Sequence, residues 1–158
     1  MTARPTKLTD EMSKRAAQKV AAALCEAGCI VDSELSGCAD DIATQATRYG
    51  DGYSLAKNLD DYCGWDCNFE MAEILNNFSH YASEEIAAAE KQWFAEHAPQ
   101  PQFSSGTRIK IKSGEHGVVD GIYEYGHAKY LVKIDGDPRA DGPSHSRRII
   151  DFEDAEAA

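Results

Sequence analysis

The chain has 158 residues, of which 42% are hydrophobic, and a formal net charge of −11 at pH 7. This length suits one domain or two small ones, and this apolar fraction excludes a wholly disordered chain. The charge is uneven: residues 1–98 hold 8 Lys and Arg against 17 Asp and Glu, whereas residues 99–158 hold 8 against 10. Because a phosphate backbone attracts bases, the acidic first part is not expected to track nucleic acid unaided.

Apolar residues recur at helical spacing through the first two thirds of the chain. The clearest stripe has one member every four residues: Met12, Ala16, Val20 and Leu24. Thr9 can cap this first helix, and Asp66 can cap the last. The predicted helices cover residues 9–28, 39–49, 53–63 and 66–96. Four amphipathic helices with short connections predict a small bundle, which we place at residues 1–97.

Residues 98–105 are rich in Pro, Gln and Ser and are predicted to be a linker, because two prolines end the preceding helix. After the linker the hydrophobic period changes from helical to two, with Ile109 and Ile111 on one face of a strand. Four strands are predicted, over residues 107–112, 117–123, 128–134 and 147–150. Residues 153–158 are predicted to be an acidic, frayed tail.

Three segments of this last third carry a resemblance to known folds: Gly106-Thr-Arg-Ile-Lys-Ile, Gly117-Val-Val-Asp-Gly-Ile and Tyr130-Leu-Val-Lys-Ile. Residues 106–152 resemble the small SH3-like barrels of the KOW and Tudor kind. The predicted fold is therefore α+β, an N-terminal four-helix module followed by a small SH3-like antiparallel β-barrel. Such barrels bind varied ligands, including nucleic acid and peptides, so the resemblance implies a fold rather than one function.

The chain holds five cysteines, all in the helical part: Cys25, Cys29, Cys38, Cys63 and Cys67. The odd number and the absence of a signal-peptide pattern favour reduced thiols. Two Cys-x3-Cys pairs resemble zinc half-sites, with His80 as a further possible ligand. The alternative is that small sulfur side chains fill the seam between helices, which is the interpretation we prefer. No metal and no cofactor are predicted.

No arrangement of residues in the sequence defines a catalytic site. His116, His127 and Asp120 lie in or near loops that could approach one another, but their spacing matches no motif. Phosphate loops, dinucleotide glycine patterns and nucleophile elbows are absent. The acidic residues over residues 54–73 argue against a helix-turn-helix there, because a helix that reads DNA carries basic and amide side chains. We predict a protein that is not an enzyme and whose helical module does not read DNA.

The stretch from residue 32 to residue 73 holds ten carboxylates and only two bases. Aromatic residues are interleaved with these acids. One interpretation is a solvated bundle face, and the other is a docking surface in which acidic rims surround aromatic anchors. The residues predicted to bind a protein partner are Asp40, Asp41, Asp60, Asp61, Tyr62, Trp65, Asp66, Glu70 and Glu73.

In its small size, acidity and lack of motifs the chain is similar to accessory proteins of phages and mobile elements, such as anti-CRISPR inhibitors. That resemblance implies an inhibitor whose acidic helical face docks on a basic, nucleic-acid-binding surface of its target. With no membrane span and no signal peptide pattern, we expect a cytoplasmic location that involves no membrane.

The alternative function is a nucleic-acid-associated protein that binds through the barrel. Tyr123, Tyr125 and Tyr130 could stack on bases. The basic residues available for this are Arg108, Lys110, Lys112, Lys129, Lys133, Arg139, Arg147 and Arg148.

Overall fold

The computed structural model describes residues 3–143 and 146–158. Its helices are α1 (Asp10–Glu26), the 3-10 turn η1 (Asp32–Glu34), α2 (Leu35–Gln45), α3 (Gly52–Cys63), α4 (Phe69–Leu75) and α5 (Phe78–His97). Its strands are β1 (Arg108–Ile111), β2 (His116–Ile122), β3 (Lys129–Ile134), β4 (Arg148–Asp151) and β5 (Ala155–Ala157), with the 3-10 turn η3 (Phe152–Asp154) before β5. The α+β class is confirmed.

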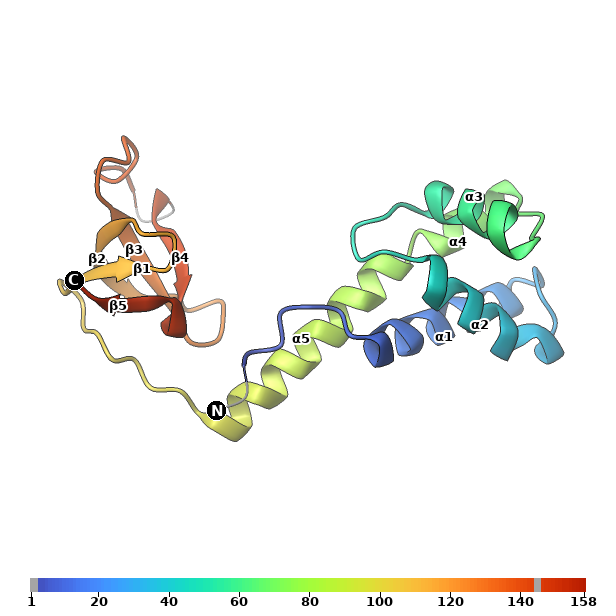
Figure 1. The fold of residues 1–158 in the computed structure, drawn as a ribbon, viewed down its shortest axis with the longest axis horizontal. Helices are drawn as coiled ribbons and strands as arrows, with labels where there is room; N and C mark the ends of the chain where they lie inside the picture. Colours follow the sequence, from blue (N-terminus) through green and yellow to red (C-terminus); the bar gives the residue numbers. More distant parts are fainter. Residues whose placement is uncertain (1–2, 144–145) are drawn as a thin grey trace. The chain divides into compact units, whose positions relative to one another are not determined.

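The chain forms two compact units, Met1–Glu90 and Lys91–Ala158, called here the helical unit and the sheet unit. In Figure 1, α1 to α4 gather in the helical unit and all the strands gather in the sheet unit. The sequence prediction set the end of the helical module at residue 97, which is where α5 ends. The division between the two units falls inside α5.

Side-chain caps start three of the helices where short polar residues precede an apolar pattern. Thr9, Asp51 and Asn68 each accept a hydrogen bond from a backbone N–H three residues later. The cap predicted at Asp66 is therefore wrong, and so is the single helix over residues 66–96. That segment forms α4 and α5, separated at Asn76 and Asn77. Asparagine is a weak helix former because its side chain bonds nearby backbone groups, and Asn76 accepts a bond from the Gly52 N–H.

The core of the helical unit contains the predicted α1 stripe, in which Ala16, Val20 and Leu24 are fully buried. Helices α2 to α4 and the start of α5 complete this core. All five cysteines are free thiols that are partly buried against it. Their small side chains thus pack at the seam between the helices.

The strands form an antiparallel sheet in the order β4-β3-β2-β1-β5, and each predicted strand matches an observed one to within one residue at either end. Its core includes Ile109, Val119, Tyr130 and Val132. The frayed tail predicted for residues 153–158 is wrong, because β5 pairs with β1. The prediction missed β5 because Ala155-Glu156-Ala157 has no β-branched or aromatic residue to indicate a strand.

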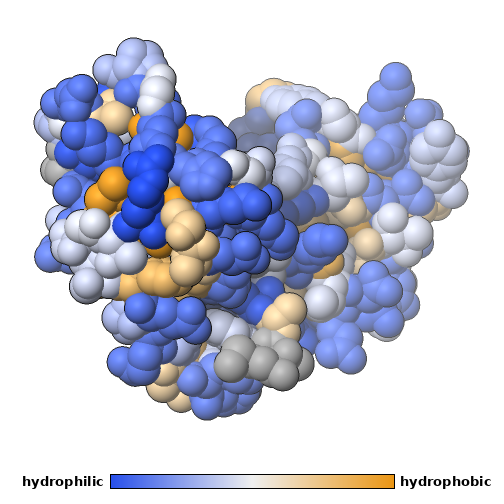
Figure 2. Space-filling model, turned by 60° about the vertical axis from the view of Figure 1, so that its left-hand side comes forward, coloured by the Kyte–Doolittle hydropathy of each residue, from blue (hydrophilic) through white to orange (hydrophobic). Residues whose placement is uncertain are grey.

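Figure 2 shows mostly hydrophilic side chains on the face in view, with hydrophobic ones limited to small areas between them. Within residues 3–143 and 146–158, no helix combines the length and the hydrophobicity needed to cross a bilayer.

Candidate functional site

In the part of the chain that the structure describes, the carboxylates between residues 32 and 73 have no basic partners. Within the described residues, none of these ten side chains forms an ion pair. Helix α5 differs, since Glu85 pairs with Arg15 at 2.6 Å and with Lys19 at 3.3 Å. Three of the predicted site carboxylates instead accept hydrogen bonds from uncharged groups. These pairs are Asp41 with the Trp65 indole, Asp60 with the Cys67 N–H, and Glu73 with the Tyr53 hydroxyl, each at 2.9 Å.

Trp65 is held in place from two sides. Gly64 ends α3 in the left-handed region at φ 73°, and the Trp65 N–H then donates to the Leu59 carbonyl at 3.2 Å. The indole Nε1–H donates to Asp41 on α2 at 2.9 Å. The ring is half-buried against the helical core. The short connection between α3 and α4 is therefore a fixed feature of the surface.

Beside Trp65 lies a hollow of about 280 Å³. It combines apolar side chains, two thiols and two carboxylates, and its lining residues are Cys29, Ile30, Glu34, Cys38, Gly64, Trp65, Asp66 and Met71. These residues come from four places in the chain: the turn after α1, η1 with α2, the α3–α4 connection, and α4. Only the tertiary structure brings them together.

The thiols near this hollow are uncharged at neutral pH. Burial, followed by the charge of Glu70, raises the pKa of Cys29, and burial with Glu34 and Asp41 raises the pKa of Cys38. The pKa of Cys67 rises to about 12, chiefly through burial and then through its hydrogen bond to Asp60. A thiolate is the form that attacks electrophiles or binds metal, so these groups are poor nucleophiles at pH 7. No cluster of three or more His, Cys, Asp and Glu side chains in the described residues is placed to hold a metal ion.

The nine predicted site residues do not share one face. Asp41, Trp65 and Asp66 surround or line the hollow, and Glu70 is close enough to act on Cys29. Asp40 and Asp61 lie on the solvent sides of α2 and α3. The other three are Asp60, Glu73 and Tyr62.

Asp60 and Glu73 lie where α3 meets α4, each bonded to a group from the other side of that junction. Tyr62 is 75% exposed. Two residues along a helix turn by about 200°, so Tyr62 points away from Asp60 on α3.

The predicted site leaves out three aromatic side chains of this stretch that the structure exposes: Tyr49, which is 85% exposed, and the neighbouring Tyr53 and Phe69. The rings of Tyr53 and Phe69 lie 6.0 Å apart and are 52% and 68% exposed. They sit beside Glu73, whose carboxylate accepts the Tyr53 hydroxyl bond. The buried face of α4 is formed by Met71, Ala72 and Leu75, and this pattern in the sequence could have marked Phe69 as a surface residue.

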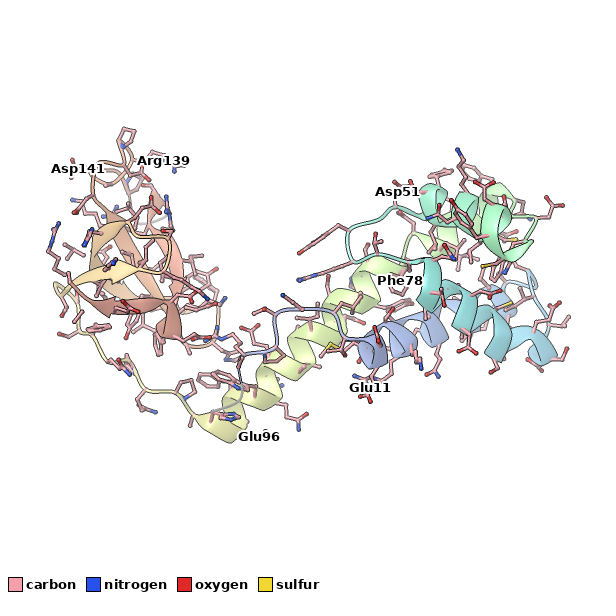
Figure 3. All side chains as sticks on the ribbon, viewed as in Figure 1. Glu11, Asp51, Phe78, Glu96, Arg139 and Asp141 are labelled. Carbon is pink, nitrogen blue, oxygen red and sulfur yellow. The ribbon has the colours of Figure 1, made fainter. Side chains whose placement is uncertain are left out.

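In the sheet unit the basic side chains are mostly paired. Seven of the eight bases predicted to contact nucleic acid form ion pairs, and Lys110 is the exception among the described residues. The pairs are Arg108–Asp135, Lys112–Asp154, Lys129–Asp151, Lys133–Asp141, Arg139–Asp137, Arg147–Asp120 and Arg148–Glu115. Arg139 and Asp141 lie in the loop between β3 and β4 (Figure 3). Little uncompensated positive charge is left for a phosphate backbone.

Tyr130 cannot stack on bases, and the prediction for this residue is wrong. Its side chain is fully buried, and its hydroxyl accepts hydrogen bonds from the N–H groups of Gln102 and Phe103 at 2.8 and 3.1 Å. The alternation of β3 places it on the inner face of the sheet together with Val132 and Ile134. Tyr123 and Tyr125 remain at the surface, where their rings lie 5.8 Å apart.

No protein-family model and no solved structure matches this chain.

Proposed function

We propose that this chain is a non-enzymatic interaction protein whose acidic helical surface docks on a basic surface of a protein partner. The name acidic surface covers the predicted residues, which lie on α2, α3, the α3–α4 connection and α4 and not on a single face: Asp40, Asp41, Asp60, Asp61, Tyr62, Trp65, Asp66, Glu70 and Glu73. The observation that carries the proposal is that the chain supplies no basic partner to any of these carboxylates in its described part. A cluster of like charges repels itself until an opposite charge arrives, so a basic surface gains both steering and affinity here.

The surface also carries aromatic side chains, which it would not need if its acidic residues served only to keep the protein in solution. Trp65 is fixed beside the hollow, and Tyr62 is exposed at the end of α3. Aromatic anchors within a charged rim are typical of binding hot spots. We place the partner among basic nucleic-acid-binding complexes, because a cluster of carboxylates imitates the charge that such surfaces accept. An inhibitor of the phage accessory kind, such as an anti-CRISPR protein, fits this description.

For the sheet unit we propose an SH3-like barrel. The support is that β5 returns to pair with β1 and that all the strands share one apolar core. Phe152 lies between β4 and β5, and its ring centroid is 4.3 Å from that of Tyr130. This contact covers the core where the two ends of a barrel would close. The paired bases argue against the alternative in which this unit binds nucleic acid.

The test is capture of partners from the native host by the full chain and by a variant with Asp40→Lys, Asp61→Lys and Glu70→Lys. Among the described residues, the side chains of these three form no hydrogen bond or ion pair, so their reversal should preserve the fold. The matched control carries Glu26→Lys, Glu124→Lys and Glu156→Lys, which changes the net charge by the same amount elsewhere.

The surface variant should lose at least about tenfold in affinity for the captured partner, mainly through slower association. The effect should fade above about 0.15 M salt, where the screening length is near 8 Å. The control should keep the affinity of the unmodified chain. If the surface variant and the control bind alike, the acidic surface is only solvated and the proposal fails.

A further inference from the structure

The hollow beside Trp65 has the character of a pocket for a single side chain. Its volume of about 280 Å³ suits one long side chain and is small for a helix or a folded ligand. Ile30, Met71 and Trp65 are apolar members of its lining, but polar atoms make up most of the lining that is open to a ligand. A lining of this mixed kind suits a side chain that joins an aliphatic stem to a polar or charged end.

The charged groups of the hollow are all negative. Glu34 and Asp66 belong to its lining, and no basic residue does. Two further carboxylates act on it from outside: Glu70 raises the pKa of the Cys29 thiol and Asp41 that of the Cys38 thiol, in both cases after the larger effect of burial. The thiols remain neutral, so they neither cancel nor add to this charge at pH 7. The hollow therefore attracts a cation.

The hollow is formed before any ligand arrives. The α3–α4 connection that carries Trp65 and Asp66 is fixed by three hydrogen bonds: Trp65 N–H to Leu59, Trp65 Nε1–H to Asp41, and Cys67 N–H to Asp60. On the other side Glu34 accepts the Val31 N–H at 3.0 Å, which fixes η1. A preorganised pocket avoids the ordering cost that a flexible acidic loop would meet on binding.

We propose that this hollow receives an arginine side chain of the protein partner. Arginine fits better than lysine, because its planar guanidinium can stack on an indole and donate forked hydrogen bonds to carboxylates. Its three-carbon stem then contacts Ile30 and Met71. This inference rests on the proposed function, for which it names the anchor residue on the partner side.

The test uses the full ¹⁵N-labelled chain and the peptide acetyl-Gly-Arg-Gly-amide, followed by two-dimensional NMR. The matched probe replaces arginine by citrulline, which has nearly the same shape but no charge. The arginine peptide should shift the Trp65 indole N–H signal and the backbone amides of Cys29 and Cys38 in a saturable way. The signal is assigned by its loss in Trp65→Phe. The citrulline peptide should produce less than about a tenth of the binding.

A double variant, Glu34→Gln with Asp66→Asn, removes the two lining charges while keeping side chains that can accept hydrogen bonds. It should bind the arginine peptide at least about tenfold more weakly. A charge-matched double variant in the sheet unit, Glu124→Gln with Glu156→Gln, lies outside the acidic surface and should bind the arginine peptide as the unmodified chain does. Unchanged amide spectra away from the hollow show that each variant is folded.

Three results would each overturn the proposal that the hollow receives arginine. These are equal binding of the citrulline peptide, NMR shifts that map outside the hollow, and unchanged binding of the arginine peptide by the double variant. The failure of the pocket and that of the proposed function can be told apart. The capture experiment reverses Asp40, Asp61 and Glu70, none of which lines the hollow, and arginine binding is measured on the unmodified chain, in which Glu70 keeps its charge. If the surface variant loses capture and the arginine peptide does not bind the unmodified chain, the pocket alone is rejected. If the arginine peptide binds but the surface variant captures the partner as the unmodified chain does, the docking function alone is rejected.

Discussion

In the sheet unit, opposite charges meet across strands and loops, whereas in the described part of the helical unit the carboxylates of residues 32–73 form no ion pair. Arg108 pairs with Asp135 and Lys133 with Asp141, so positive charge that looks available in the sequence is already compensated. Exposed pairs of this kind add little stability, about 0–1 kcal/mol each. The difference teaches that net charge and available charge are separate properties. Only unpaired charge can recruit a partner.

The acidic surface depends on the close packing of α3 against α4. Gly52 at the start of α3 lies against α4, where a Cβ would come within 2.1 Å of the Ala72 carbonyl oxygen and 2.5 Å of the Asn76 N. Both of these atoms belong to the backbone, so they cannot move without displacing α4. Gly52→Ala should therefore destabilise the helical unit by on the order of 3 kcal/mol or more. Urea unfolding followed by Trp fluorescence measures this change.

The control for that substitution is Gly37→Ala in the first turn of α2, where nothing lies within 4 Å of the added Cβ. Removing a helical glycine should stabilise the chain by about 0.5–1 kcal/mol. If Gly52→Ala is neutral, the close approach of α3 and α4 is wrong, and with it the placement of Asp60 and Glu73.

The sheet unit has its own buried polar support at Tyr130. Tyr130→Phe removes the hydroxyl that accepts two backbone N–H bonds and leaves those donors without their partner. The expected cost is about 1–3 kcal/mol. Tyr125→Phe, at a side chain that is 88% exposed, should change the stability by less than about 0.5 kcal/mol. Equal effects of the two substitutions in urea unfolding would place Tyr130 at the surface and restore it as a candidate base-stacking residue.

The two units should respond differently to alkali. All five thiols lie in the helical unit, and the pKa of each is raised in the folded state, for Cys67 to about 12. A raised folded pKa gives stability that is complete below the unfolded pKa, about 8.5, and is lost as the pH rises through the folded value. The helical unit should therefore weaken between about pH 8.5 and pH 12, and more steeply than the sheet unit.

Cys67→Ala should remove part of that alkaline loss. NMR signals from each unit, followed through urea unfolding at pH 8 and pH 10, separate the two responses. At acid pH both units should weaken, because hydrogen-bonding partners lower the pKa of Asp51 and Glu85 in the helical unit and of Glu115, Asp137 and Asp141 in the sheet unit. A lowered folded pKa gives stability that is lost as the pH falls through it. An equal alkaline loss in both units would contradict the assignment to the thiols.

The smallest expected effect is a change in DNA affinity when basic side chains of the sheet unit lose their acidic partners. Asp135→Asn with Asp141→Asn frees Arg108 and Lys133 and should raise binding to single-stranded DNA a few-fold at low salt. Glu124→Gln with Glu156→Gln makes the same change in net charge without releasing a base, and should have less effect. Fluorescence anisotropy across a salt series gives both affinities. Strong DNA binding by the unmodified chain would show that ion pairing does not mask these bases.

Much of the architecture could be predicted because it depends on local pattern. The stripe through Ala16, Val20 and Leu24 specified α1 and its buried face, and the alternation around Ile109 specified β1. The break at Asn76 and the strand at Ala155–Ala157 could not be predicted in this way. Each depends on a partner distant in the chain, Gly52 in one case and β1 in the other.

The same division holds for the candidate site. The sequence by itself determined that residues 32–73 are acidic and rich in aromatic side chains, because composition needs no fold. Only the tertiary structure decided that Trp65 and Asp41 meet and that Tyr130 is buried. It also decided that the bases of the sheet unit are compensated. The physical reason is that pairing and burial depend on distances between residues far apart in the chain, which local periodicity does not contain.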